Sequence, residues 1–137
     1  MSAVIDTPPI IIRRRNNLND IKQELNRELM AAKDVYQALD KKFGQDIVIL
    51  EINAISPIAD YFIIATGGSV PQIQAMASAT EEAMEKNNYH LRHKEGIRTA
   101  NWILLDFGEI IVHLFDKENR GFYNLERVWG DAKFITP

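Results

Sequence analysis

The chain has 137 residues, a formal net charge of −3 and no cysteine. The lack of cysteine excludes disulfides, thiolate metal sites and cysteine nucleophiles. Hydrophobic residues make up 46% and charged residues 26% of the chain, which is ordinary for one globular domain with a single core. A negative net charge argues against a generic nucleic-acid binder and fits a partner whose contact surface is positive.

Two features of the sequence bear on where the protein works. No apolar run approaches the roughly 18 residues that a membrane-spanning helix needs. Near the N-terminus, Ile10–Ile12 precede Arg13–Arg15, which reverses the order of a secretory signal peptide. We therefore expect a cytoplasmic protein without a membrane partner.

Residues 1–16 contain Pro8, Pro9 and the arginine triplet but no sustained hydrophobic period. This pattern predicts a flexible N-terminal arm, followed by one folded domain over residues 17–137. A plain extension is the favoured interpretation of the arm. A basic arm that makes a minor contact with RNA is the alternative, and deleting residues 1–16 would separate the two.

The first predicted element is an amphipathic helix that begins at Leu18 and ends before Gly44. Its apolar residues recur every three or four positions: Leu18, Ile21, Leu25, Leu29, Ala32, Val35, Leu39 and Phe43. The pattern is long for one helix of a globular protein, so a break near Met30 stays open.

The rest of the chain alternates between strand and helix patterns. The predicted elements are strands over 46–52 and 61–65, a helix over about 70–86, a strand over 89–94, a hairpin over 101–115 and a final helix over about 117–129. Ser69 is a natural N-cap for the helix at 70–86. This order predicts an α/β fold, a single compact domain with one mixed β-sheet flanked by helices.

The hairpin has two faces because side chains alternate across a strand. A two-residue loop at Phe107-Gly108 predicts three facing pairs: Trp102 with His113, Leu104 with Ile111, and Asp106 with Glu109. A three-residue turn with a bulge at Gly108 would change these pairs. One face is purely aliphatic and is predicted to be core: Ile103, Leu105, Ile110, Val112 and Leu114.

The opposite face of the hairpin mixes aromatic, aliphatic and polar residues: Trp102, Leu104, Asp106, Glu109, Ile111, His113 and Phe115. Facing carboxylates at Asp106 and Glu109 would disfavour folding by under about 1 kcal/mol, and a solvated tip would explain those two residues alone. An aromatic residue beside acidic groups is typical of a binding hot spot with charge steering. We therefore predict a partner-binding site at Trp102, Asp106, Glu109 and His113.

The final helix adds two further candidates for this site. Phe122, Leu125 and Trp129 share the stripe that is predicted to face the core, and Trp129 is predicted to pack there. Tyr123 and Glu126 lie on another side and are candidate partner contacts. Gly121 lowers helix propensity by about 1 kcal/mol relative to alanine, which would delay the start of the helix.

An enzymatic reading rests on Gly67-Gly68-Ser69, between a predicted strand and a predicted helix. Amides at a helix N-terminus bind phosphate, and such turns open the active sites of nucleotidyltransferases. That chemistry needs two or three carboxylates on a neighbouring strand to hold metal ions. The sequence has no Asp-x-Asp pair, and the first aspartate after Ser69 is Asp106. A structural turn is favoured; a nucleotide- or phosphate-binding transferase is the rival.

No other catalytic or metal-binding pattern is present in the sequence. There is no nucleophile elbow, P-loop or His-Glu-x-x-His motif. His90 and His93 would point to opposite faces of their predicted strand, and His113 has no partners at ligand spacing. We expect no metal and no cofactor.

The C-terminal segment resembles the ribosomal silencing factor family, the Iojap or RsfS proteins. The matching positions are Trp102, Asp106, Phe107, Gly108, Glu109, His113 and Phe115, followed by Arg120, Phe122, Tyr123, Leu125, Glu126, Val128 and Trp129. Upstream, the similarity continues through Asp46–Leu50 and Ile58–Gly67, so that it covers about residues 30–131. Matches at fixed spacing over this length make the resemblance specific.

The resemblance implies a nucleotidyltransferase-like scaffold without the catalytic carboxylates, and therefore no enzyme. Family members bind the large ribosomal subunit through its protein fourteen. They sterically block association with the small subunit and so repress translation when nutrients are limiting. Family members often form homodimers, and the sequence leaves open whether a Trp-bearing face would serve a second copy or the ribosome.

Overall fold

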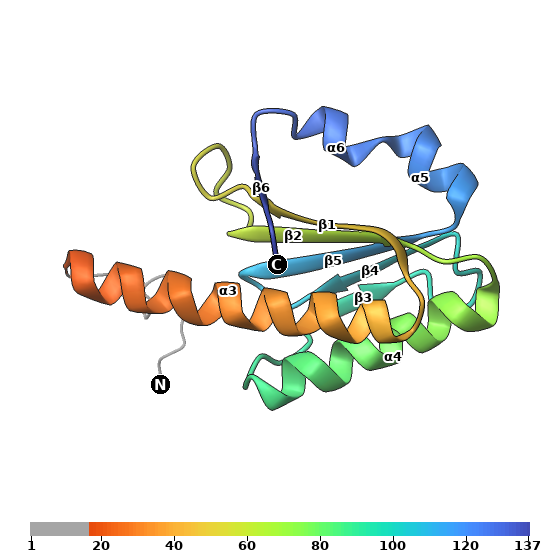
Figure 1. Cartoon of the computed structure of the whole chain (residues 1–137), viewed down its shortest axis with the longest axis horizontal. Helices are drawn as coiled ribbons and strands as arrows, with labels where there is room; N and C mark the ends of the chain where they lie inside the picture. Colours follow the sequence, from red (N-terminus) through yellow and green to blue (C-terminus); the bar gives the residue numbers. More distant parts are fainter. Residues whose placement is uncertain (1–16) are drawn as a thin grey trace.

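The computed structural model describes residues 17–137, which form one domain around a six-stranded sheet of order β3-β4-β5-β2-β1-β6 (Figure 1). The strands are β1 (Gln45–Glu51), β2 (Tyr61–Thr66), β3 (His93–Glu95), β4 (Trp102–Asp106), β5 (Ile110–Phe115) and β6 (Lys133–Ile135). β2 and β5 are parallel, whereas the other neighbours are antiparallel. The predicted mixed α/β fold is confirmed, and the predicted arm at residues 1–16 lies outside the described residues.

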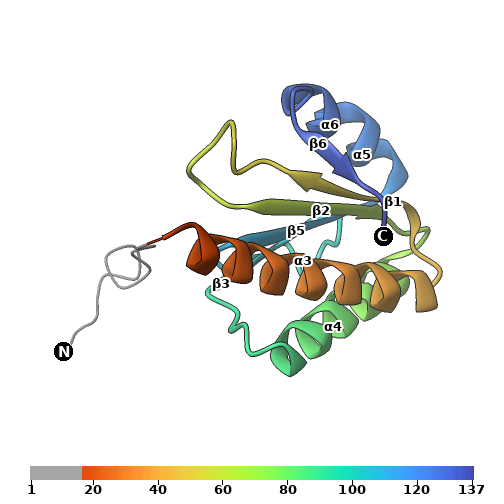
Figure 2. The same cartoon turned by 60° about the vertical axis from the view of Figure 1, so that its left-hand side comes forward.

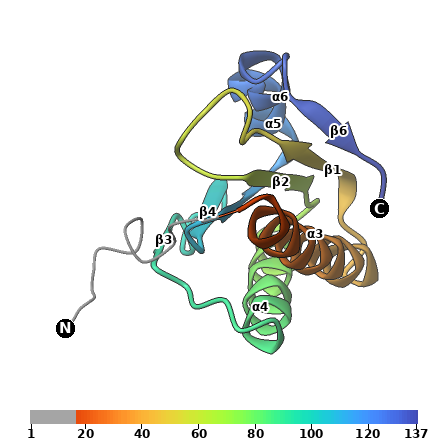
Figure 3. The same cartoon turned by 90° about the vertical axis from the view of Figure 1, so that its left-hand side faces the viewer.

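Helices lie on both faces of the sheet (Figures 2 and 3). α3 (Leu18–Lys41) and α4 (Val70–Lys86) cover one face, and the short helices α5 (Lys117–Tyr123) and α6 (Leu125–Val128) lie on the other. β2 is buried along its whole length, whereas burial alternates along β4 and all of β3 is exposed. The α5–α6 side of the sheet is therefore open over β3 and β4.

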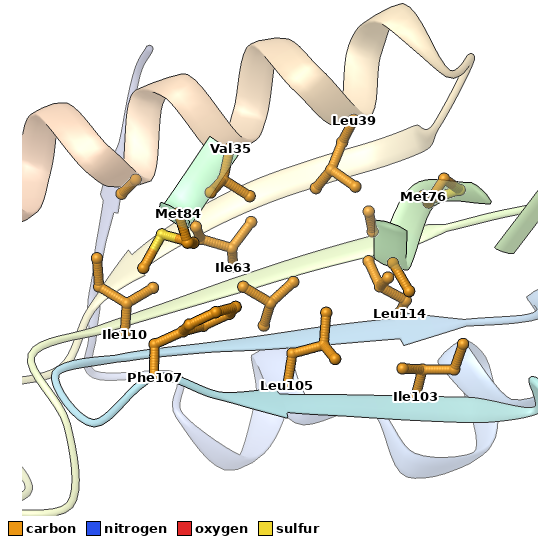
Figure 4. Close-up of a cluster of buried hydrophobic side chains, with 14 of the residues drawn as sticks. Val35, Leu39, Ile63, Met76, Met84, Ile103, Leu105, Phe107, Ile110 and Leu114 are labelled. Atoms are coloured by element: carbon orange, nitrogen blue, oxygen red, sulfur yellow. The ribbon is translucent and has the colours of Figure 1, made fainter. Parts of the chain in front are cut away.

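The main core fills the space between the sheet and helices α3 and α4 (Figure 4). This cluster contains Val35 and Leu39 of α3, Met76 and Met84 of α4, and Ile63 of the sheet. All five residues of the predicted aliphatic hairpin face are fully buried: Ile103, Leu105, Ile110, Val112 and Leu114. The period-two prediction of the core face is confirmed.

A second core lies between the sheet and α6. Its buried residues are Leu50, Ile52, Ala59, Phe62, Ile64 and Phe115. Leu125 and Trp129 pack against it, and the Trp129 ring meets Phe62 edge-on at 5.3 Å between centroids. Core packing is therefore confirmed for these two residues. It is wrong for Phe122, which is 77% exposed, because Asn124 (φ +48°) ends α5 and interrupts the helical period.

The predicted facing pairs of the hairpin are wrong by two residues. The structure pairs Trp102 with Phe115, Leu104 with His113, and Asp106 with Ile111. The loop consists of Gly108 and Glu109, because the Phe107 amide still donates to the Ile110 carbonyl (2.9 Å) and Gly108 takes φ +93°. Glycine at the first loop position is the pattern of a type II′ hairpin. A shift of two residues keeps every side chain on its predicted face.

Other boundaries also differ from the predictions. α3 runs without a break past Met30, and only His93–Glu95 of the predicted strand at 89–94 forms a ladder. The predicted final helix begins at Lys117, so Gly121 does not delay its start, and it splits at Asn124. β6 was not predicted, because three residues are too few for a periodic signal. In residues 17–137 no helix is both long and apolar enough to cross a membrane.

Two glycines give a matched stability prediction. A Cβ at Gly67 would lie 2.5 Å from Ile73 Cγ1, so we expect Gly67→Ala to lower the free energy of unfolding by about 1–3 kcal/mol through overpacking. A Cβ at Gly121, inside α5, would meet nothing within 4 Å. Gly121→Ala is expected to raise the same free energy by about 0.5–1 kcal/mol. Urea unfolding of both variants checks this; equal effects would contradict it.

Candidate functional site

The predicted site residue Trp102 is half-buried at the start of β4. Its ring packs against Tyr123 of α5 at 4.5 Å and against Phe115 of β5 at 5.0 Å between centroids. Its indole N–H donates a hydrogen bond to Nδ1 of His113 (3.1 Å). Contacts on several sides therefore fix the orientation of an aromatic side chain that still reaches the surface.

The buried side chain of His113 lies beneath Trp102 and accepts its hydrogen bond. Its side chain is 4% exposed, and burial lowers its pKa to about 4, so the ring is neutral near pH 7. Because Nδ1 accepts from Trp102, the proton of the neutral ring lies on Nε2. Nε2 has no hydrogen-bond partner among residues 17–137. His113 was predicted as a partner contact; the structure instead places it beneath the surface, where it holds Trp102.

Asp106 and Glu109 lie at the other end of the hairpin, about 13 Å along β4 from Trp102. Asp106 Oδ1 accepts a hydrogen bond from the Gly108 amide (2.8 Å), which stabilises the turn. The Glu109 carbonyl accepts from the amides of Asp60 and Tyr61 (2.8 and 3.1 Å). The structure therefore brings Trp102, His113 and Tyr123 together but separates both acidic residues from them.

The uncovered part of the sheet adds residues that sequence reasoning missed. His93 and Glu95 of β3 pair with Asp106 and Leu104 and so lie on the same face, whereas Lys94 points to the other side and meets Glu81 of α4 (3.4 Å). We call this surface the open face; it consists of His93, Glu95, Trp102, Leu104, Asp106, Ile111 and Tyr123. Apolar side chains lie at its centre and carboxylates at its edge. The period-two rule could have found the β3 residues if the strand had been placed correctly.

Glu126, the remaining candidate contact, is bound to a neighbouring arginine of the same chain. Its carboxylate accepts hydrogen bonds from Arg120 Nη2 (2.7 Å) and Nε (3.2 Å). Burial alone would raise the pKa of Glu126, but the hydrogen bonds and charge of Arg120 outweigh burial and lower it. The carboxylate is therefore held in its ionised form by its neighbour.

The Gly67-Gly68-Ser69 turn uses its polar groups internally. The Gly67 amide donates to the Phe115 carbonyl (2.9 Å), and the Gly68 amide donates to Gln72 Oε1 (2.6 Å). Ser69 caps α4 as predicted, since its hydroxyl accepts from the Gln72 amide (3.2 Å). Gln72 Nε2 also donates to the carbonyls of Lys42 and Phe43, which joins the end of α3 to the start of α4. These contacts support the structural reading of the turn.

The histidines do not converge on a common point. His93 contacts Glu95 on the exposed strand β3, His90 precedes that strand, and His113 packs against Phe62 of the second core. Within residues 17–137, no group of three or more histidine, aspartate or glutamate side chains is arranged to hold a metal ion.

Comparisons with known proteins agree with the fold and the C-terminal residues. The family described as "Ribosomal silencing factor during starvation" matches residues 23–137. The chain is 42% identical over 95 residues to ribosomal silencing factor RsfS of Bacillus subtilis, covering 69% of this chain and 80% of that protein. It is 38% identical over 110 residues to RsfS of Halalkalibacterium halodurans, covering 80% and 92%.

A solved structure supports the same conclusion. The crystal structure of a protein from Chromobacterium violaceum superposes with a TM-score of 0.72 at 27% identity, covering 74% of this chain and 85% of that one. The family match extends over most of the chain, and both relatives exceed 30% identity. The chain therefore belongs to the ribosomal silencing factor (RsfS/Iojap) family of ribosome-binding factors, which are not enzymes.

Proposed function

We propose that this protein binds the large ribosomal subunit through that subunit's protein fourteen, and that the open face is the contact surface. The main observation is that one sheet face is left uncovered by helices over β3 and β4, with Trp102 held in place at its end. A rigid aromatic residue loses little side-chain entropy on binding and is a frequent hot spot.

The charge of the open face fits a basic partner. Glu95 lies opposite Leu104 on the neighbouring strand, Asp106 follows Leu104 by two residues on β4, and the chain as a whole has a net charge of −3. Carboxylates at the edge of an interface attract a basic surface and speed association, while the apolar centre supplies most of the affinity. A ribosomal protein that neutralises RNA meets this requirement.

The functional consequence is steric. A protein bound to protein fourteen at the subunit interface would occupy space that the small subunit needs, and no chemical step is required. We propose that this occlusion represses translation in the cytoplasm when nutrients are limiting. A second copy of the chain is an alternative occupant of the open face, and it would compete with the ribosome.

Sedimentation through sucrose tests the proposal. We expect the full-length protein to sediment with purified large subunits at low salt and to remain at the top of the gradient when mixed with small subunits. We also expect it to reduce the yield of joined ribosomes. Recombinant protein fourteen should compete for the binding. Failure to co-sediment with the large subunit, or co-sedimentation that excess protein fourteen does not reduce, would overturn the proposal.

A further inference from the structure

Arg120 of α5 contacts three other elements at once. Its guanidinium binds Glu126 of α6, its Nη1 donates to Thr66 Oγ1 of β2 (2.9 Å), and its Nη2 donates to the Asp46 carbonyl of β1 (2.7 Å). The side chain is 11% exposed. The rigid fork of arginine can satisfy acceptors in several directions, which the single ammonium of lysine cannot do in the same geometry.

The Asp46 carbonyl is available to Arg120 because β1 has a bulge. Gln45 pairs with Thr66 and Val48 pairs with Ile64, so two residues of β1 lie opposite one residue of β2. Asp46 takes φ +50°, in the left-handed region that aspartate tolerates better than most residues. A bulged residue is left out of the strand ladder, and here its carbonyl accepts from the arginine instead.

Hydrophobic burial does little to hold α5 in place. Neither α5 nor α6 contains a buried residue, and α5 contributes no side chain to either core. α6 and the turn after it are anchored by Leu125 and Trp129. The side-chain attachments of α5 to the sheet are polar or aromatic: Arg120 on β1 and β2, and Tyr123 on Trp102.

We infer that Arg120 is a positioning residue for the open face, because its guanidinium fixes α5 on the sheet and so holds Tyr123 against Trp102. Tyr123 follows Arg120 by three residues, which places both on neighbouring positions of the same helix side. Without the guanidinium, α5 moves independently of the sheet, and a partner must order it on binding. The inference rests on the proposed function of the open face, although its structural part can be tested in the free protein.

The experiment uses the full chain with Trp129→Phe, which leaves Trp102 as the only tryptophan. In this background we compare Arg120→Ala, Arg120→Lys and Thr66→Val with Arg127→Ala, a control that removes an exposed arginine of α6. The measurements are amide hydrogen exchange over residues 117–128, acrylamide quenching of Trp102 fluorescence, and affinity for purified large subunits.

We expect Arg120→Ala to speed exchange over 117–123 at least tenfold, to increase quenching of Trp102 and to weaken subunit binding about tenfold. Arg120→Lys and Thr66→Val should have smaller effects in the same direction, and Arg127→Ala should have none. The swap of Arg120→Glu with Glu126→Arg should not restore the original values, because it recreates the ion pair but not the contacts to Thr66 and the Asp46 carbonyl.

The outcomes test the positioning role of Arg120 and the proposed function of the open face separately. Unchanged exchange and quenching in Arg120→Ala would overturn the positioning role, whatever happens to binding. Full restoration by the charge swap would show that the contacts of Arg120 with Thr66 and the Asp46 carbonyl are not needed. If the parent protein does not bind the subunit, the proposed function fails, while exchange and quenching still decide the role of Arg120. Should Arg120→Ala not fold, the lysine and Thr66→Val variants give the same comparison.

Discussion

Trp102→Ala is expected to weaken binding to the large ribosomal subunit about 30-fold or more, which corresponds to about 2 kcal/mol. The substitution removes the largest apolar side chain of the open face and, with it, the aromatic contact to Tyr123 at 4.5 Å. It also leaves His113 Nδ1 without its hydrogen-bond donor, in a ring that is already buried and neutral. The measurement is the affinity for purified large subunits, with folding checked by thermal unfolding.

Three further variants separate the loss of a direct contact with the subunit from a loss of protein stability. Trp102→Phe keeps an aromatic ring at this position but loses the indole N–H and part of the ring area, so its affinity should fall less than that of the alanine variant. Leu104→Lys places a positive charge on the open face, where a long side chain can remain solvated, and should weaken binding to a basic partner about tenfold. Trp129→Phe, in the second core, should leave binding unchanged. If Trp102→Ala and Leu104→Lys both fold and bind like the parent, the open face is not the contact surface.

Charge can be tested apart from shape at Asp106. Asp106→Asn retains an oxygen that can accept from the Gly108 amide, so the hairpin turn is preserved while the negative charge is lost. We expect a several-fold loss of affinity that shrinks as salt concentration rises, because salt screens the same attraction in the parent. A loss of affinity that does not depend on salt would mean that Asp106 acts through shape alone.

The sequence predicted which hairpin residues face the core but not which residues face each other. Period-two alternation depends only on the pleat, so an error of two residues in the loop left the faces intact. The loop itself could have been placed from Gly108, because a two-residue turn of type II′ has glycine at its first position. Phe107 then continues the aliphatic face, and it is buried in the main core.

The site was harder to predict because its residues depend on tertiary contacts. Tyr123 reaches Trp102 only because α5 is attached by Arg120, and the attachment uses the Asp46 carbonyl of a β-bulge far away in sequence. Propensities report local preferences and do not encode such contacts. The break at Asn124 likewise depends on a left-handed residue in a segment whose apolar period continues through it.

The burial of Glu28 could have been predicted from its spacing in the sequence, but it was not. It lies three residues after Leu25 and four before Ala32, on the apolar side of α3, and is 1% exposed. Burial, a hydrogen bond with Asp60, and the nearby charges of Asp60, Glu109 and Glu24 raise the pKa of Glu28 from its ordinary 4.5 to about 9. The protonated carboxyl of Glu28 can donate a hydrogen bond to the Asp60 carboxylate. In the folded protein, Glu28 therefore keeps its proton near neutral pH.

Glu28→Gln is therefore expected to stabilise the protein increasingly as pH rises. The folded parent retains a proton on Glu28 that the unfolded chain releases above its ordinary pKa. Between about pH 4.5 and 9 the Glu28 contribution to the free energy of unfolding falls as pH rises, by up to about 1.4 kcal/mol per pH unit. Glutamine keeps a donor for Asp60 and has no proton to lose, so this slope disappears from the variant.

The difference in unfolding free energy between Glu28→Gln and the parent isolates this contribution. Titrating groups that do not interact with Glu28, such as the buried His113, act equally in both proteins and cancel. Urea unfolding at several values from pH 5.5 to 8.5 should give a difference that grows with pH and favours the variant. Glu85→Gln, on the exposed surface of α4, is the matched control and should show no trend. A constant difference across this range would mean that Glu28 is ionised in the folded protein and that its neighbours stabilise the charge.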